Sequence, residues 1–333
     1  MSASRVLVTG GRGFVASWLV KGLLEGGDEV TSFDRESPGD GHPGRHSGLA
    51  LHGIEADVQE LRGDLRDPEA VGRALSVARP EIVFHLAAQT IVGTAARAPA
   101  ETFDVNVRGT WTVLEGCREH GVDAVVFASS DKAYGAHEAL PYRESAALLP
   151  TAPYEASKAA ADILARSYWD AFSLPVAVTR FANVYGGGDT NFSRLVPETV
   201  SAVLEGRRPV LRSDGTPQRD LLYVEDAARA YLAVADALEG GGATGEAFNA
   251  GGERPYSVLE IVETIARVAG TELEPEILGE GTPSGEIDRQ FVDSTKLREL
   301  TGWRPEVSLE DGLRRTIEWY RAHPEIRAPA PVA

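Results

Sequence analysis

The N-terminal stretch constrains the fold most, because a short apolar run leads at once into a glycine-rich turn and an amphipathic segment. Arg5–Val8 is typical of a buried strand, and Phe14–Glu25 has the length and spacing of a helix. Between them stand Gly10 and Gly13, and Ala16 follows in the first helical turn, where small side chains let a ligand approach the backbone. A strand, glycine turn and helix in this order predict a parallel sheet whose first turn binds a dinucleotide pyrophosphate.

The same rhythm of apolar runs and amphipathic stretches continues through the first half of the chain, and after about Asn183 it changes to glycine-rich loops, helices and short strands. Buried runs between helical stretches indicate an α/β fold, a Rossmann-type doubly wound parallel sheet with helices on both faces. We expect this sheet domain over residues 1–182, a smaller lobe mainly over 183–327 with the chain crossing back, and a flexible tail at 328–333. The further strands that we predict are Glu29–Phe33, Glu81–Leu86, Ala124–Ala128 and Val176–Arg180.

Charge and cysteine content exclude several classes of partner. The formal net charge of −17 argues against nucleic acid and anionic membranes, which both require basic surface. The single cysteine, Cys117, rules out an internal disulfide and favours the cytoplasm. It lies in a helical pattern, so we expect a buried structural thiol. The sequence has no signal peptide pattern, no long apolar span and no Cys/His cluster of metal-binding type.

The choice of cofactor is indicated by an acidic residue at the end of the second predicted strand. Asp34 lies about twenty residues beyond the glycine turn, where a carboxylate can bind a ribose 2′-hydroxyl and repel a 2′-phosphate. This favours NAD over NADP, although the neighbouring Arg35 weakens the inference. Other candidate cofactor contacts are Phe14, Asp64, Leu65, Ala87 and Ala88.

The candidate chemical groups are concentrated in two segments. Ser130, Asp131 and Lys132 offer a hydroxyl, a carboxylate and an amine on successive residues. Tyr154 and Lys158 are four residues apart, on one face of a helix. A phenol can take a proton from an alcohol, and a neighbouring ammonium group favours this by lowering the phenol's pKa. With a redox cofactor, these groups predict transient oxidation of a sugar-like alcohol followed by further chemistry.

Seven motifs in a fixed order carry a family resemblance over nearly the whole chain. They are Thr9-Gly10-Gly11-Arg12-Gly13-Phe14, His85-Leu86-Ala87-Ala88-Gln89, Asn106-Val107-Arg108-Gly109-Thr110, Tyr154-x-x-x-Lys158, Arg180-Phe181-Ala182-Asn183-Val184-Tyr185-Gly186, Arg219–Asp226 and Leu300–Pro305. This sequence resembles the extended short-chain dehydrogenase/reductase family, in its nucleotide-sugar epimerase and dehydratase branch. The resemblance implies tightly held NAD, a nucleotide-diphosphate sugar bound between two lobes, and a homodimer formed by helices near 99–119 and 154–172.

The resemblance also assigns roles to individual residues. Tyr154 corresponds to the base that deprotonates the sugar 4-hydroxyl, Lys158 to the residue that binds the nicotinamide ribose, and Ser130 to a hydroxyl that binds the same sugar oxygen. Asp131-Lys132 is similar to the pair in CDP-glucose 4,6-dehydratases and in inverting 4,6-dehydratases, whereas simple 4-epimerases usually carry small uncharged residues there. The implied diphosphate contacts are Asn183, Arg194 and Arg219.

Two activities remain open at this stage. In a 4,6-dehydratase, Asp131 would protonate the departing 6-hydroxyl and Lys132 would handle the proton on carbon 5. In a 4-epimerase, the two side chains would only orient the sugar, and an ion pair of Lys132 with Asp131 or Glu144 would be structural. Two further alternatives are a non-catalytic binding protein, opposed by the intact Ser130, Tyr154 and Lys158, and an NADPH-dependent reductase. The base and the sugar stay open.

Overall fold

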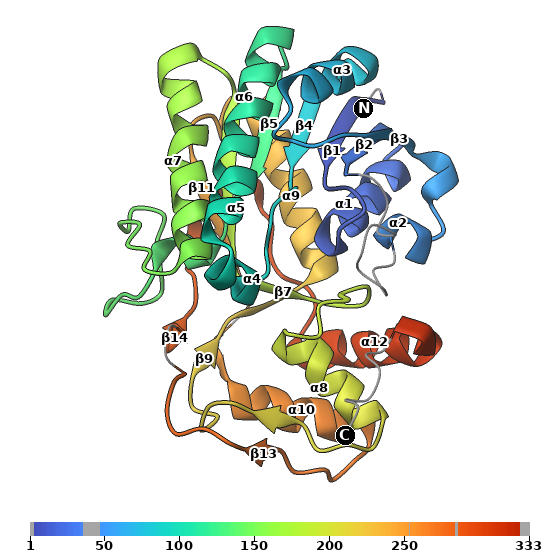
Figure 1. Ribbon diagram of the computed structural model, residues 1–333, viewed down its shortest axis with the longest axis vertical. Helices are drawn as coiled ribbons and strands as arrows, with labels where there is room; N and C mark the ends of the chain where they lie inside the picture. Colours follow the sequence, from blue (N-terminus) through green and yellow to red (C-terminus); the bar gives the residue numbers. More distant parts are fainter. Residues whose placement is uncertain (1–2, 36–46, 253, 284–285, 327–333) are drawn as a thin grey trace.

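The computed structural model describes residues 3–35, 47–252, 254–283 and 286–326, and its centre is a parallel sheet of seven strands (Figure 1). The strand order is β11-β6-β5-β4-β1-β2-β3. This order reverses between β1 and β4, the point at which doubly wound sheets bind ligands. The strands are β1 (Arg5–Thr9), β2 (Glu29–Asp34), β3 (Gln59–Arg62), β4 (Ile82–His85), β5 (Ala124–Ala128), β6 (Val176–Phe181) and β11 (Ala247–Ala250).

Helices cover both faces of the sheet because alternate strand residues bury their side chains on opposite sides. Val6 and Val8 belong to the core under α1 (Phe14–Glu25), α9 (Val224–Glu239) and α11 (Thr295–Thr301). Leu7 belongs to the opposite core, which is covered by α3 (Pro68–Ala78), α6 (Gly109–His120) and α7 (Pro153–Phe172). Two short helices, α4 (Val92–Arg97) and α5 (Pro99–Phe103), pack against α7. The Rossmann-type α/β fold is therefore confirmed.

Most sequence predictions agree with these elements to within one or two residues. The helix predicted at Phe14–Glu25 and the strand predicted at Ala124–Ala128 have the predicted bounds. Cys117 is fully buried, and burial raises the pKa of its thiol to about 12, so the prediction of a structural thiol is confirmed. Two strands of the sheet, β3 and β11, were not predicted. The tail at 328–333 lies outside the described residues.

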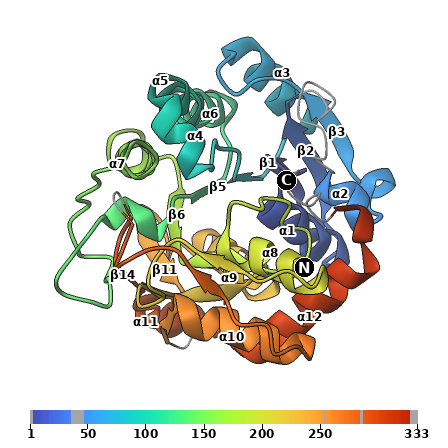
Figure 2. The same ribbon diagram turned by 60° about the horizontal axis from the view of Figure 1, so that its bottom comes forward.

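The smaller lobe packs three helices around its own apolar core, which includes Val200, Ile261 and Leu313. Figures 1 and 2 show these helices gathered at one end of the sheet domain. They are α8 (Leu195–Leu204), α10 (Val258–Ala269) and α12 (Leu309–Ala322). Its strands are β7 (Asn183–Tyr185) with β10 (Leu221–Tyr223), β9 (Gln218–Arg219) between β12 (Tyr256–Ser257) and β14 (Arg289–Gln290), and β8 (Val210–Leu211) with β13 (Glu276–Ile277).

Between these lobe elements the chain returns to the sheet domain in α9, β11 and α11. The lobes also meet at Trp18 on α1, whose indole Nε1 donates to the carbonyl oxygen of Gly187 at 2.8 Å. Gly187 lies so close to Trp319 on α12 that a Cβ there would be 2.3 Å from the indole. This contact fixes the lobe beside the glycine turn. No helix in the described parts of the chain is long and apolar enough to cross a membrane.

Candidate active site

The glycine turn after β1 is shaped for close contact between backbone segments. Gly10 has φ +74°, and a Cβ there would lie 2.8 Å from the Cα of Ala87, which follows β4. Gly13 caps α1 without any side-chain hydrogen bond from the described residues, and the first turn of α1 contains no acidic residue. The first amides of α1 are thus free to bind an anion, which fits a pyrophosphate and hence NAD.

The predicted cofactor acids differ in how their carboxylates are engaged. Asp34 ends β2 beside the glycine turn, where it accepts hydrogen bonds from the backbone nitrogens of Arg12 at 3.3 Å and Arg35 at 2.8 Å. Burial raises its pKa above the ordinary value. Asp64 is instead bound by the guanidinium of Arg66 at 2.6 and 2.9 Å, so this ion pair competes with any contact to adenine.

The predicted apolar cofactor contacts lie in different surroundings. Leu65 is buried in the sheet core. Phe14 packs against the core of the smaller lobe, and Ala88 is half-buried after Ala87.

Asn106 fixes the loop that follows β4, a role that the sequence did not reveal. It lies in a π-helical turn, Asp104–Arg108, and is buried. Its side chain exchanges two hydrogen bonds with the backbone of Gln89, at 2.7 and 2.9 Å, and donates to Ser157 Oγ at 2.9 Å. Ser157 in turn donates to the carbonyl oxygen of Tyr154 at 2.7 Å. Asn106 and Ser157 therefore connect the loop that follows β4 to the start of α7.

Tyr154 and Lys158 are buried on the first turns of α7, close to the end of β5. Lys158 Nζ donates to the carbonyl oxygen of Ala128 at 2.8 Å, and burial lowers its pKa to about 8. Burial raises the pKa of Tyr154 to about 12, and the opposing contributions come from Arg194 and Ser130. The expected lowering of the phenol pKa by Lys158 is therefore wrong for this structure, because desolvation of the phenolate dominates.

The turn Asp131–Tyr134 carries the second group of predicted catalytic residues. Ser130 caps it, accepting from Lys132 N and donating to Asp131 Oδ1, each at 3.2 Å. Asp131 is 1% exposed, and burial raises the pKa of its carboxyl to about 6. Its Oδ2 has no hydrogen-bond partner among the described residues.

Lys132 is half-buried and forms no ion pair within 4.0 Å with any described residue. Its amine instead donates to the side-chain oxygen of Gln290 on β14 at 3.4 Å. Burial lowers the pKa of the Lys132 amine, the nearby carboxylate of Asp131 opposes this, and the charge of Arg219 adds to the lowering. The structural alternative, an ion pair with Asp131 or Glu144, is therefore absent from the part of the chain that the structure describes.

The three predicted diphosphate contacts come from the smaller lobe or its border. Arg194 caps α8, binds Asp189 at 3.0 Å, and lies near enough to Tyr154 to lower the pKa of the phenol. Asn183 begins β7 and donates from Nδ2 to the carbonyl oxygen of Asp220 at 3.3 Å. Arg219 on β9 is paired with Glu286 at 3.0 Å. The structure thus brings Arg194 toward Tyr154 and Arg219 toward Lys132.

Two fully buried residues at this site were not predicted as site residues. Asp220 accepts backbone hydrogen bonds from Gly252 at 2.7 Å and Val292 at 3.2 Å, and burial raises its pKa to about 7. The negative charge of Asp131 raises it further. Gln290 contacts Lys132 as described above. The motif around Arg219 contained Asp220, but no signal in the sequence distinguished Gln290.

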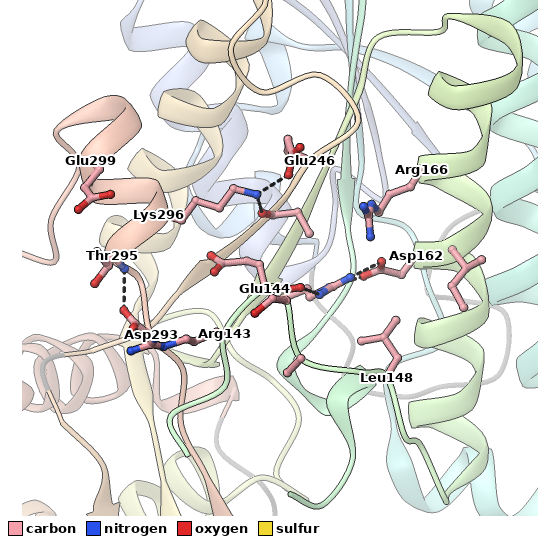
Figure 3. A pocket seen from close by; sticks show the side chains of 15 residues that line it. Arg143, Glu144, Leu148, Asp162, Arg166, Glu246, Asp293, Thr295, Lys296 and Glu299 are labelled. Carbon is pink, nitrogen blue, oxygen red and sulfur yellow. Dashed lines mark hydrogen bonds and ion pairs between the residues drawn. The ribbon is translucent and has the colours of Figure 1, made fainter. Parts of the chain in front are cut away.

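A cavity of about 880 Å³ lies near the other side of the same turn, between α7, α11, β11 and the loop 143–148 (Figure 3). Its buried charges are paired: Arg180 binds Asp162 through two hydrogen bonds of 2.7 and 2.8 Å. Lys296 is similarly paired with Glu246 at 2.5 Å. Because these ionised groups satisfy one another, the cavity is a poor candidate for the reacting centre.

Comparisons with known proteins agree with this geometry. A family model described as the NAD dependent epimerase/dehydratase family matches residues 6–251. The dTDP-D-glucose 4,6-dehydratase of Mus musculus is 32% identical over 328 residues, covering 96% of this chain and 89% of the mouse protein.

Two solved structures, from both activity classes, are equally similar in fold. UDP-glucose 4-epimerase from Thermotoga maritima with UDP-glucose has a TM-score of 0.86 and 31% identity, covering 96% of this chain and 99% of that one. dTDP-glucose 4,6-dehydratase from Streptomyces venezuelae with NAD bound has a TM-score of 0.86 and 31% identity, covering 96% and 98%. With NAD as its cofactor, the chain belongs to the NAD-dependent epimerase/dehydratase family of enzymes.

Proposed function

We propose that this enzyme is a nucleotide-sugar 4,6-dehydratase that acts through a 4-keto intermediate. The observation that carries the proposal is the pair of buried Asp131 and half-buried Lys132, adjacent to Ser130 and not joined in an ion pair among the described residues. Burial moves their pKa values toward neutrality from opposite sides, raising that of Asp131 and lowering that of Lys132. An acid and a base with converging pKa values suit concerted proton transfers near neutral pH.

The first stage is formation of a ketone at carbon 4 of the sugar. NAD held by the glycine turn after β1 and by Asp34 would supply the hydride acceptor for carbon 4 and the hydride donor for carbon 6. Tyr154 removes the proton of the 4-hydroxyl, and Ser130 donates a hydrogen bond to the same oxygen. Lys158 lies on the same face of α7 as Tyr154 and would bind the nicotinamide ribose. The ketone then acidifies the hydrogen on carbon 5.

The second stage removes one water molecule. The neutral amine of Lys132 takes the proton from carbon 5, and the electron pair of that bond forms a double bond to carbon 6. The bond between carbon 6 and its oxygen breaks as Asp131 gives its proton to the departing hydroxyl. Carbon 6 then receives the hydride that carbon 4 gave up, and Lys132 returns a proton to carbon 5, so the 4-keto-6-deoxy product differs from the substrate by one water.

The substrate that fits this site is a nucleoside diphosphate sugar. Arg194 and Arg219 present guanidinium groups, whose planar donors match phosphate oxygens, and Asn183 adds an amide. Arg194 acts on Tyr154 and Arg219 acts on Lys132, so both guanidinium groups lie close to the proposed catalytic residues. The identity of the base is left to the substrate panel below.

The second candidate is a nucleotide-sugar 4-epimerase, which the Thermotoga maritima structure favours equally by its overall similarity. An epimerase needs Tyr154 but no proton transfer at carbon 5. The deciding experiment incubates the holoenzyme with a panel of CDP, GDP, UDP and dTDP sugars in heavy water and measures products by mass spectrometry. Loss of one water with deuterium at carbon 5 supports the dehydratase, whereas an isomer without solvent deuterium contradicts it.

Replacement of Lys132 separates the two stages. In Lys132→Ala we expect dehydration to fall by about 100-fold or more, because proton transfer to a positioned base is lost. Transient NADH absorbance should remain, since Tyr154 still forms the ketone. Lys21, an exposed lysine on α1, provides the matched control in Lys21→Ala. Dehydration at the wild-type rate in Lys132→Ala would show that Lys132 is structural.

We also propose a homodimer that buries the outer faces of α5, α6 and α7. These faces expose large apolar side chains, among them Trp111 at 45% and Ile163 at 61%, together with Phe103 and Phe172. Exposed apolar clusters on adjacent helices are characteristic of subunit interfaces. Light scattering of the wild type and of Trp111→Glu tests this: a dimer that becomes a monomer supports it, and a wild-type monomer contradicts it.

A further inference from the structure

Gln290 is the remaining polar side chain in contact with the catalytic pair, and the mechanism above gives it no role. It lies on β14, in register with Arg219 on the neighbouring β9, and is 0% exposed. Its backbone oxygen accepts from the nitrogen of Asp220 at 3.0 Å, so the strand holds the side chain in a defined direction. Complete burial of an amide is costly unless its polar atoms are satisfied.

The amide faces both members of the pair. Its oxygen accepts from Lys132 Nζ at 3.4 Å. Its nitrogen and Asp131 Oδ2 are both buried without a geometrically satisfied hydrogen bond among the described residues, yet the amide acts on Asp131 and lowers the pKa of that carboxyl. One amide carries an acceptor and two donors, so it can serve a cation and a carboxylate at once.

We propose that Gln290 is a positioning residue that holds the amine of Lys132 away from the carboxyl of Asp131. Each group then enters the reaction as a separate base and acid instead of a neutralised ion pair. The inference rests on the proposed dehydratase function for its catalytic consequence, but the separation of the two charges can be measured without turnover.

The neutrality of the amide matters because the surroundings are already charged. The groups that act on Asp131 or Lys132, or respond to Asp131, are Arg219, Asp220, Glu155, Glu286, Tyr142 and Tyr154. A carboxylate at position 290 would pair with Lys132 and raise the pKa of its amine, and would disfavour ionisation of Asp131. An apolar side chain of the same length would release Lys132 toward Asp131, which also raises the pKa of the amine.

The test compares Gln290→Glu and Gln290→Met with Arg289→Met, a change at the exposed neighbouring residue on the same strand. In the holoenzyme, the pH dependence of acylation by acetic anhydride is mapped onto each lysine by peptide mass spectrometry, with Lys21 as the internal reference. We expect the apparent pKa of Lys132 to lie below that of Lys21 in the wild type and in Arg289→Met. It should rise in both Gln290 variants. An unchanged acylation profile in those variants would overturn the proposal.

Turnover provides the second measurement. We expect both Gln290 variants to lose about 100-fold in deuterium exchange at carbon 5, the loss typical of a displaced catalytic group. The transient NADH absorbance that reports oxidation at carbon 4, with Tyr154 as base, should persist. A misfolded site would lose this signal as well. Wild-type exchange rates in Gln290→Met would overturn the positioning role. If the wild type epimerises without exchange, the dehydratase function fails, and the acylation profile still decides whether Gln290 separates the pair.

Discussion

The two ends of the turn Asp131–Tyr134 differ in how completely their buried polar groups are hydrogen-bonded. On the side of Tyr134, the phenol donates to Asn249 at 2.8 Å and accepts from Arg180 at 3.1 Å. Arg180 is fully buried and bonded through two nitrogens to Asp162. Its remaining nitrogen also donates to a backbone carbonyl oxygen, that of Glu144. Among the described residues, the charges of Arg180 and Asp162 on this side satisfy each other.

On the side of Asp131, the buried atoms are incompletely paired. Asp131 Oδ2, Gln290 Nε2 and Ser129 Oγ have no geometric hydrogen-bond partner among the described residues. Native proteins leave few such atoms, and those that remain call for an explanation such as catalysis or an absent ligand. The comparison teaches that burial alone does not mark a reactive group in this fold. Incomplete pairing distinguishes the reacting side from the supporting side.

The largest expected effect comes from removing the phenolic oxygen of Tyr154, which belongs to the side that we propose reacts. Tyr154→Phe should lower turnover by about 10,000-fold, the upper range for loss of a general base, while the free energy of unfolding stays near the wild-type value. Product formation by mass spectrometry and urea denaturation of the NAD-bound protein measure the two quantities. Wild-type turnover in this variant would refute the assignment of Tyr154.

The next effect acts on the supporting side. Arg180→Met leaves the carboxylate of Asp162 buried without its cation, so the free energy of unfolding should fall by about 3–5 kcal/mol. The matched control is the double variant Arg180→Met/Asp162→Leu, which removes both charges and should recover much of the loss. Urea denaturation at pH 7 with saturating NAD gives these values. A single variant as stable as the wild type would break the comparison, because the pair would then have no supporting role.

Asp131→Asn should separate stability from activity. The folded pKa of this carboxyl is raised to about 6 from 3.8, so its burial opposes folding once the unfolded carboxyl ionises. The penalty grows as pH rises from about 3.8 to about 6 and is constant above that. We therefore expect the variant to exceed the wild type by up to about 3 kcal/mol in unfolding free energy at pH 8, and to match it near pH 4. Dehydration should be lost. Equal stabilities across this pH range would show that burial does not strain the carboxyl.

The smallest effect tests whether the supporting side is only structural. Tyr134→Phe removes the phenolic oxygen between Arg180 and Asn249 and should cost about 1 kcal/mol in unfolding free energy. Turnover at saturating substrate should be unchanged, because the Tyr134 hydroxyl is bonded to Asn249 and Arg180, and these residues have no proposed role in the reaction. A fall in turnover without a fall in stability would mean that the two sides of the turn are coupled during the reaction.

The sequence predicted the sheet well because buried parallel strands are continuous apolar runs, as in Ala124–Ala128. It did not predict β3, where three of the four residues Gln59–Arg62 are polar and the strand lies at a sheet edge, or β11, whose place depends on distant parts of the chain. Ser130, Asp131, Lys132, Tyr154 and Lys158 could be named as candidates because the local spacing of their reactive groups carries information, and their catalytic roles stay predictions.

Residues that act through tertiary contacts were harder to predict. Gln290 is 158 positions from Lys132, and only the pairing of β14 with β9 brings the amide to the amine. The sign of the Tyr154 pKa shift was also wrong at the sequence level, because spacing reveals the neighbouring Lys158 but not the extent of desolvation. The roles of Asn183, Arg194 and Arg219 stay predictions until a substrate is identified.

The position of β11 late in the sequence affects how the protein folds during synthesis and where it can be truncated. This strand, at residues 247–250, pairs with β6, and α9 covers the same end of the sheet. A fragment that stopped at residue 182 would leave β6 as an unpaired edge and one apolar face bare, which invites aggregation. The ribosome must therefore release the part of the smaller lobe from β7 to β10 before the sheet can close. The two lobes are parts of one folding unit, and residues 1–182 are not expected to fold as an independent domain.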